Sequence, residues 1–184
     1  IYTDDQAPFA VNAAGDKRFI TPHIDRIFHE GAHLTNSFVT TPVCSPARVG
    51  LIASRYGTEM GITDWINPGR EASLGLRPGT PTWPQLLANA GYRNGLFGKW
   101  HLGANYPFRP QDRGFEESVW YPSSSIPSVP AYWGNDYFDD VYIHNGKNQR
   151  YEGYCTDVFF AEAKRFMLES AKKKKPFFCY LATN

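Results

Sequence analysis

The sequence lacks the features that would place it in a membrane, in a disulfide scaffold or on nucleic acid. None of its apolar runs is long enough to cross a bilayer, so we expect no membrane span. Three cysteines are too few for a domain built on disulfides. With 19 basic and 18 acidic residues the formal net charge is +1, so no overall field favours nucleic acid. A globular domain remains, and 184 residues suffice for a sizeable core.

No secretion signal is visible, but residues 1–3 read as the tail of a strand, so we expect a chain truncated at its start. Cys155 and Cys179 either pair or remain two core thiols, and the second interpretation is favoured. The one charge run, at residues 172–175, is typical of a solvated helix end.

The stretch around which the chain is organised is CSPAR, at residues 44–48. Proline suits the first turn of a helix, which predicts Pro46 at the first helical position, Ser45 as the N-cap and Cys44 just ahead of it. The free N–H groups and the positive dipole end of that helix favour an anion beside Cys44. Arg48, one turn on, adds a fixed positive charge suited to oxyanions.

Around this stretch the pattern alternates between strands and helices, which is typical of an α/β fold with strands buried between helices. Thr82 and Gln85 have the spacing of a capping box at the start of a helix. Asn145 and Gly146 predict a hairpin turn. The expected strands are the end of residues 1–5, then 34–40, 92–97 and 176–182. The expected helices begin at Pro22, Pro46, residue 83 and a cap at Thr156.

Four polar residues lie where such strands end. Asp4 and Asp5 can share one cation only if the strand turns into a loop there, because neighbouring strand residues point to opposite faces. Carboxylate oxygens suit hard cations. Lys99 and His101 follow the strand at 92–97, and both project to one side if the extended geometry persists. Ligands in open α/β sheets bind at such carboxyl ends.

Three segments together resemble a known family. TPHIDR at residues 21–26, TPVCSPAR at 41–48 and GKWHLG at 98–103 resemble, in that order, the type I (formylglycine-dependent) sulfatases of the alkaline phosphatase superfamily. The resemblance implies a mixed, mainly parallel β-sheet flanked by helices and truncated at both ends. Residues 1–184 would then be the N-terminal portion of one catalytic domain, with a loop-rich insertion at about 104–155. The family's second metal-binding pair and leaving-group acid are not identifiable in this chain.

The resemblance also implies a chemistry. A formylglycine-generating or anaerobic sulfatase-maturating enzyme would oxidise Cys44 to formylglycine, whose hydrate carries a nucleophilic hydroxyl and a second hydroxyl that expels sulfate. Asp4, Asp5 and residue 44 would hold a divalent cation, usually Ca²⁺, with Mg²⁺ or another as alternatives. Arg48 and Lys99 would bind the sulfate, and His101 would contact the nucleophile's oxygen and act as a base. Ala47, where many members carry serine, is a variant that the family accepts.

The function that follows is hydrolysis of a sulfate ester on a small molecule or carbohydrate, in a secreted, periplasmic or lysosomal-type protein. Two alternatives stay open: a phosphatase or phosphonate monoester hydrolase of the same superfamily, and a non-catalytic binder of sulfated glycans. Aromatic residues of the loop-rich stretch either rim a sugar site or pack the long insertion, and packing is favoured. They are Trp120, Tyr121, Tyr132, Trp133, Tyr137 and Phe138.

Overall fold

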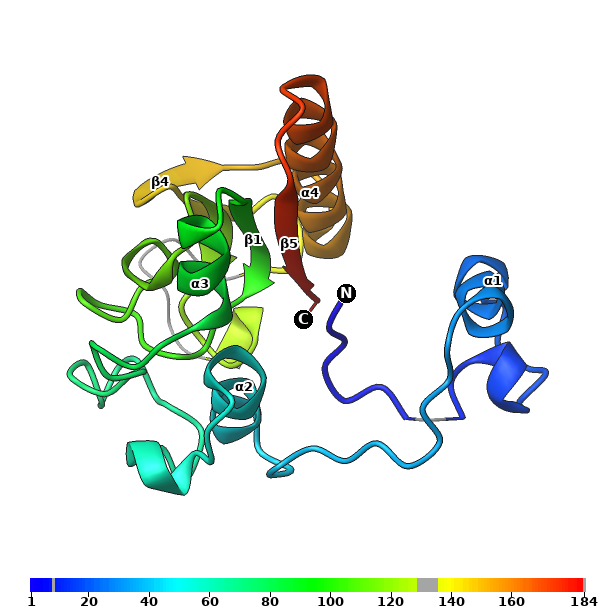
Figure 1. Ribbon diagram of the computed structural model, residues 1–184, viewed down its shortest axis with the longest axis horizontal. Coiled ribbons are helices and arrows are strands. Elements are labelled where there is room, and N and C mark those ends of the chain that lie inside the picture. The colour runs from blue at the N-terminus through cyan, green and yellow to red at the C-terminus, as the bar shows by residue number, and fades with distance from the viewer. Residues whose placement is uncertain (8, 129–135, 184) are drawn as a thin grey trace.

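The computed structural model describes residues 1–7, 9–128 and 136–183, and its centre is a five-stranded mixed sheet in the order β4-β3-β2-β1-β5. β1 pairs in parallel with both β2 and β5, whereas β3 pairs antiparallel with β2 and with β4. The expected mixed α/β sheet is therefore present (Figure 1). The strands are β1 (Arg93–Lys99), β2 (Glu117–Tyr121), β3 (Val141–His144), β4 (Lys147–Arg150) and β5 (Phe177–Ala182).

Helices cover both faces of this sheet. The α-helices are α1 (Pro22–Glu30), α2 (Cys44–Ala53), α3 (Trp83–Asn89) and α4 (Cys155–Lys172). Short 3-10 helices are η1 (Asn12–Ala14), η2 (Thr58–Met60), η3 (Pro110–Arg113) and η4 (Ile126–Ser128). Because neighbouring strand residues point to opposite faces, Leu96 packs with Val49 of α2 while Phe97 packs with Phe159 and Phe166 of α4. The two apolar clusters are thus the two sides of the sheet.

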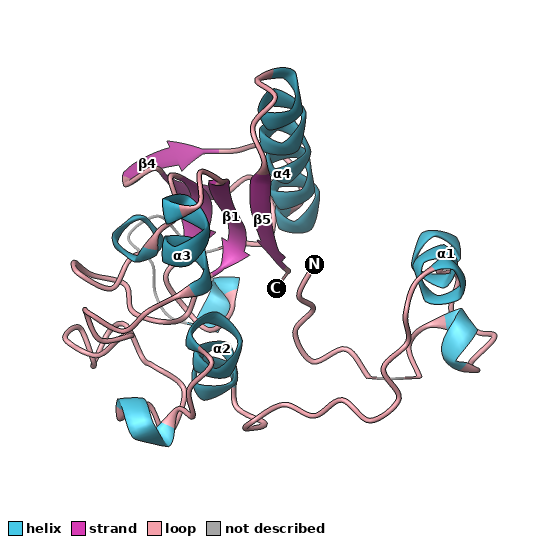
Figure 2. Cartoon of the chain, in the orientation of Figure 1, coloured by secondary structure: helices cyan, strands magenta, loops and turns pink. Residues whose placement is uncertain are grey.

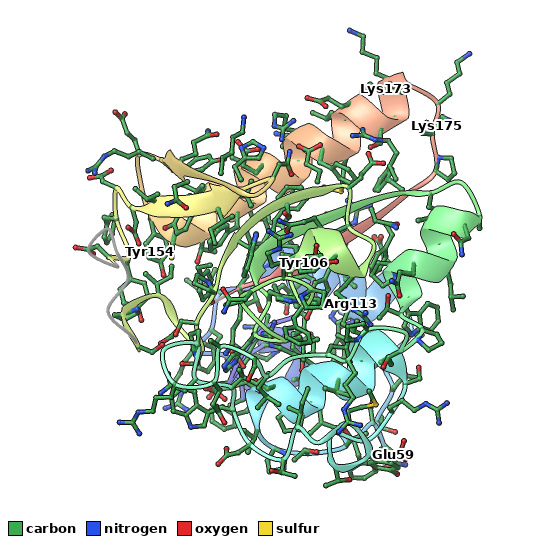
Figure 3. All side chains as sticks on the ribbon, turned by 90° about the vertical axis from the view of Figure 1, so that its left-hand side faces the viewer. Glu59, Tyr106, Arg113, Tyr154, Lys173 and Lys175 are labelled. Carbon is green, nitrogen blue, oxygen red and sulfur yellow. The ribbon has the colours of Figure 1, made fainter. Side chains whose placement is uncertain are left out.

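Several local predictions are confirmed. The Thr82 hydroxyl accepts the backbone N–H of Gln85 at 3.4 Å and caps α3 as expected. Asn145 and Gly146, with φ of 49° and 82°, form the turn between β3 and β4. At the exposed end of α4, the side chains of Lys173 and Lys175 extend away from the body of the molecule, which agrees with a solvated charge run (Figure 3).

Two strand predictions are wrong. Residues 34–40 form an exposed loop, shown in pink in Figure 2, where Leu34 and Phe38 are 74% and 89% exposed. A strand needs a neighbouring strand, and this segment has none among the described residues. Conversely, residues 117–121, expected as loop, form the buried strand β2. Because β1 and β3 flank it and both of its faces are covered, its sequence has no alternation to reveal it.

Two helix starts also differ from expectation. α2 begins at Cys44 with Val43 as its N-cap, so Cys44 lies inside the first turn rather than ahead of it. Ser45 is thus a helical residue rather than the N-cap, and its hydroxyl accepts the backbone N–H of Ile66 at 3.0 Å. α4 begins at Cys155, one residue before the expected cap Thr156. Leu51 of α2 and Leu86 of α3 are 44% and 60% exposed.

The segment around α1 lies apart from the sheet (Figure 1). α1 packs against η1, where the Asp25 carboxylate accepts the backbone N–H of Ala13 at 2.9 Å. None of the residues of α1 is buried. Cys155 and Cys179 are both free thiols at the α4 side of the sheet, as the favoured interpretation expected. Within the described ranges, no helix is long and apolar enough to cross a membrane.

Candidate active site

The site lies at the edge of the sheet where the parallel strands end. The first residues of the chain run beside β5, because Tyr2 N–H donates to Leu181 O at 2.7 Å and Thr183 N–H donates to Tyr2 O at 3.1 Å. This pairing delivers Asp4 to the edge at which β1 ends with Lys99. The carboxyl ends of parallel strands are where open α/β sheets bind ligands.

A cavity of about 550 Å³ opens at this edge. It brings together Asp4, Asp5, Cys44 and Lys99, four of the six residues that the sequence assigned to the site. The other residues that line it are Ser124, Ser125, Tyr137 and Tyr154. The first turn of α2 presents Cys44 to the cavity from a helix N-terminus, which favours negative charge nearby.

Both aspartates face the same cavity because the backbone turns between them. Asp5 has φ of 51°, in the left-handed region, so the extended geometry ends there. This is the turn that a shared cation requires. The two carboxylates are oxygen donors of the kind that hard divalent cations prefer, so Asp4 and Asp5 fit part of a Ca²⁺ or Mg²⁺ shell.

Two buried cations surround Asp4. Lys99 Nζ donates to Asp4 Oδ2, and Arg48 Nη2 lies 3.7 Å from the same oxygen. The side chains of Lys99 and Arg48 are 2% and 0% exposed. Charges this deeply buried need compensation, and Asp4 supplies it. Of the two cations only Lys99 lines the cavity, so a bound anion would meet its ammonium there.

Arg48 is fixed in place from three sides. Its Nη1 donates to Lys99 O at 2.7 Å and to the Tyr180 hydroxyl at 3.3 Å, and its guanidinium lies 5.0 Å from the ring centre of Tyr2. Burial raises the pKa of Tyr180 to about 12, so its hydroxyl stays neutral. Within the described residues Arg48 Nε and Nη2 make no hydrogen bond, and Nη2 forms the ion pair with Asp4.

His101 lies next to this cluster rather than in the cavity wall. Its φ of 58° ends the extended geometry, so it does not project beside Lys99 as the i, i+2 spacing predicted. Its Nε2 donates to Ile66 O at 2.9 Å, which leaves Nδ1 as the unprotonated nitrogen. Nδ1 is buried and has no partner in the described part of the chain. Burial, reinforced by the charges of Lys99 and Arg48, lowers the pKa of His101 to about 4.

The structure explains the choice of residue at several positions of the GKWHLG segment. Gly98 has φ of 105°, and a Cβ there would lie 1.9 Å from Ala182 O, so the backbones of β1 and β5 approach too closely for any side chain. Trp100 is fully buried, and its Nε1 donates to Phe108 O at 2.8 Å. Lys99 between them is the residue that reaches the cavity.

Sequence reasoning missed three lining residues. Ser124 and Ser125 follow β2, which was expected to be loop, and Tyr154 precedes α4. The run of three serines at residues 123–125, separated from the aromatic residues 120–121 by Pro122 alone, was the available signal. Of the loop aromatics singled out, Tyr137 lines the cavity, whereas Tyr132 and Trp133 lie outside the described residues.

A second group of possible metal ligands lies elsewhere on the sheet. Ligand atoms of Glu117, His144 and Glu162 are within 4.8 Å of one another. Arg165 already donates to Glu117 and, at 2.8 Å, to Glu162. Arg93 also lies 3.3 Å from Glu117. The two carboxylates therefore belong to an ion-pair network that links β1, β2 and α4.

The fold and this cluster define an α/β protein with a cavity lined by charged residues at the carboxyl edge of its sheet. The sulfatase family model matches residues 1–184, and the chain belongs to that family. The chain is 33% identical over 175 residues, 95% of its length, to an N-acetylglucosamine-6-O-sulfatase of Bacteroides thetaiotaomicron. It is 28% identical over 97% of its length to a mouse (Mus musculus) N-acetylgalactosamine-6-sulfatase.

The chain spans only 28% and 37% of the lengths of these two relatives. Among solved structures it is similar to Ps i-CgsB, with a TM-score of 0.90 and 29% identity, over all of this chain and 44% of that one. The same protein is also known in complex with k-i-k-neocarrahexaose, and that structure matches with a TM-score of 0.88, 28% identity and 43% of its chain covered.

Proposed function

We propose that this chain carries the sulfate-binding side of the active site of a sulfuric ester hydrolase. The observation that carries the proposal is the convergence of Cys44, Asp4, Asp5 and Lys99 on one cavity, with Arg48 buried behind them. The family to which the chain belongs supports the same reaction. Residues 1–184 would form the N-terminal portion of one catalytic domain.

Lys99 and Arg48 bind and polarise the sulfate group. Both cations are buried, so their attraction for an anion is screened less than it would be at the surface. The Arg48 guanidinium is held in a fixed plane, and its Nε and Nη2 make no hydrogen bond in the described part of the chain, which suits a tetrahedral oxyanion. The N-terminus of α2 adds the same sign of potential at Cys44. Charge that develops on the nonbridging oxygens is stabilised by donors that are already in place.

Asp4 and Asp5 would hold a divalent cation, Ca²⁺ first and Mg²⁺ or another as alternatives. When bound, such an ion supplies Lewis acidity and offsets the charge of the sulfate. Lys99, whose ammonium pairs with Asp4, lines the same cavity and would contact the sulfate oxygens there. Two carboxylates fill only part of the shell of six to eight oxygens that Ca²⁺ takes.

Position 44 would carry formylglycine, produced from Cys44 by a formylglycine-generating or anaerobic sulfatase-maturating enzyme. Its hydrate supplies a nucleophilic hydroxyl and a second hydroxyl from which a proton is removed. We assign that proton to His101, whose Nδ1 is unprotonated and whose Nε2 is committed to Ile66. Its neutral form persists at physiological pH because burial keeps its pKa low.

The substrate class that we propose is a sulfated carbohydrate. Two of the relatives are named as sulfatases of amino sugars, and Ps i-CgsB binds a carrageenan oligosaccharide. For the protein that contains this chain we propose the secreted, periplasmic or lysosomal setting in which such substrates occur.

The test is a comparison of matched esters. The full-length protein, produced with a maturation enzyme and supplied with Ca²⁺, is assayed on p-nitrophenyl sulfate and p-nitrophenyl phosphate, with Cys44→Ala as the control. We expect a higher kcat/KM on the sulfate and no turnover by Cys44→Ala. A higher kcat/KM on the phosphate would favour the phosphatase alternative. Binding of sulfate without turnover of either ester would favour the non-catalytic binder.

A further inference from the structure

The cavity at residue 44 has two chemically different parts. One part is charged and consists of Asp4, Asp5 and Lys99 beside Cys44. The other consists of two serines and two tyrosines, none of them charged. A volume of about 550 Å³ falls within the range of small-molecule sites and exceeds what a sulfate group fills. The remaining space must therefore accommodate the part of the substrate that carries the sulfate.

The two tyrosines of this wall are held by backbone pairing between residues 137–139 and 153–155, here called the clamp. Cys155 N–H donates to Tyr137 O at 2.8 Å, and Phe138 and Tyr154 form an antiparallel bridge. Outside this bridge, Gly153 N–H donates to the side chain of Asp139 at 2.7 Å. The clamp adjoins the first residue of α4, so both tyrosines are attached to the rigid part of the fold. Such preorganisation lowers the cost of binding a ligand.

The exposure of these rings separates them from the tyrosines of the core. Tyr137 and Tyr154 are 37% and 40% exposed, whereas Tyr121 and Tyr142, which come from adjacent strands, are 3% and 1% exposed. Phe138 packs against Tyr154 with ring centroids 5.2 Å apart, which supports one side of that ring. The rings of Tyr137 and Tyr154 thus line the cavity and remain partly accessible to solvent, unlike those of the core tyrosines.

We propose that Tyr137 and Tyr154 bind the pyranose ring that carries the sulfate ester, and so select sugar sulfates. The inference rests on the function proposed above. A pyranose has apolar C–H faces that match an aromatic ring and hydroxyls at its edge that match Ser124 and Ser125. The sulfate is then directed to Lys99 by charge, and the ring is directed to the tyrosines by shape and apolar contact.

The experiment separates recognition of the ring from recognition of the sulfate. In the full-length matured protein, kcat/KM is measured on a panel of sulfated monosaccharides that includes N-acetylglucosamine 6-sulfate, and the fastest is kept. Inhibition by inorganic sulfate reports the charged part alone. We expect Tyr137→Ala and Tyr154→Ala each to lower kcat/KM on the sugar sulfate about tenfold, with the Ki of inorganic sulfate unchanged.

Matched variants test whether a loss of activity comes from the loss of the aromatic ring at these two positions. Tyr137→Phe and Tyr154→Phe keep the ring and should retain most of the activity. Tyr106→Ala is the control, because Tyr106 is a 75% exposed loop tyrosine that does not line the cavity and lies away from Tyr154 (Figure 3). If an alanine variant also loses inhibition by sulfate, the leucine variant at that position, which keeps apolar bulk without a ring face, replaces it.

The outcomes distinguish this inference from the proposed function. Unchanged kcat/KM in all alanine or leucine variants would overturn the role of the tyrosines while leaving the sulfatase function intact. Turnover of p-nitrophenyl sulfate but of no sulfated sugar would overturn the substrate class. Turnover of no sulfate ester at all would overturn the proposed function and this inference with it.

Discussion

The buried imidazole of His101 makes the folded protein sensitive to acid in a defined pH window. Its pKa falls from an ordinary 6.5 to about 4 because burial penalises the charged form. Below pH 6.5 the unfolded chain binds a proton at this residue while the folded chain does not, until about pH 4. The contribution of His101 to the free energy of unfolding is therefore fully present above pH 6.5 and is lost as the pH falls from 6.5 to about 4. The shift corresponds to about 3 kcal/mol.

The assay is urea unfolding of the full-length protein at a series of pH values from 7.5 to about 4. His101→Gln removes the titration but retains a donor for Ile66 O, so its stability should depend less steeply on pH, by about 3 kcal/mol over the window. His33→Gln serves as the control because His33 is exposed and should leave the wild-type slope unchanged. Identical slopes for wild type and His101→Gln would refute a buried, neutral His101.

Three further predictions concern the frame of the site. Tyr180→Phe removes a hydroxyl that accepts a hydrogen bond from Arg48. It should lower the free energy of unfolding in urea by about 1 kcal/mol and slow the turnover of sulfate ester. Unaltered kinetics would argue that Tyr180 does not help to position Arg48. Asp5→Ala should abolish Ca²⁺ binding in calorimetric titration without unfolding the protein. Asp4→Ala should abolish it and also lower the free energy of unfolding, because Lys99 and Arg48 lose the carboxylate that compensates them. An unchanged Ca²⁺ affinity in either variant would show that its carboxylate is not a ligand. Gly98→Ala should cost at least about 2 kcal/mol in thermal or urea unfolding, because its Cβ would meet a backbone oxygen of β5; a neutral result would contradict the close approach.

Features set by local sequence were predictable from it. The Thr82 cap and the Asn145 turn each depend on a few neighbouring residues, and both occur where they were expected. The strands β1 and β5 were also found, because each is a compact run bounded by turn or helix signals. Lys99 was correctly expected at the end of the strand that became β1.

Features set by distant partners were not predictable. Residues 34–40 have the composition of a strand but no neighbour to pair with, whereas β2 has two neighbouring strands but no alternating pattern. Ser45 would be a suitable N-cap, but it lies inside the helix and its hydroxyl accepts the N–H of the loop residue Ile66. His101 leaves the expected direction because its backbone turns to reach the same residue, Ile66.

The residues of the site also fall into a predictable and an unpredictable group. Its charged half was recognisable because Cys44, Arg48 and Lys99 belong to short motifs that match a family. Its neutral half was not, because Ser124 and Tyr154 come from segments 30 residues apart that meet only when β2 and α4 assemble. Motifs therefore identified the reacting groups, while the structure was needed to identify the wall that surrounds them.

The central claim is that residue 44 acts as formylglycine in a sulfatase site, and the mass of the peptide that contains it tests this most directly. Trypsin releases residues 27–48, in which Cys44 is the only cysteine. From protein produced with a maturation enzyme, we predict the mass of the aldehyde at position 44, and the mass of the thiol from protein produced without it. A thiol in both preparations, together with equal turnover of sulfate ester, would contradict the account.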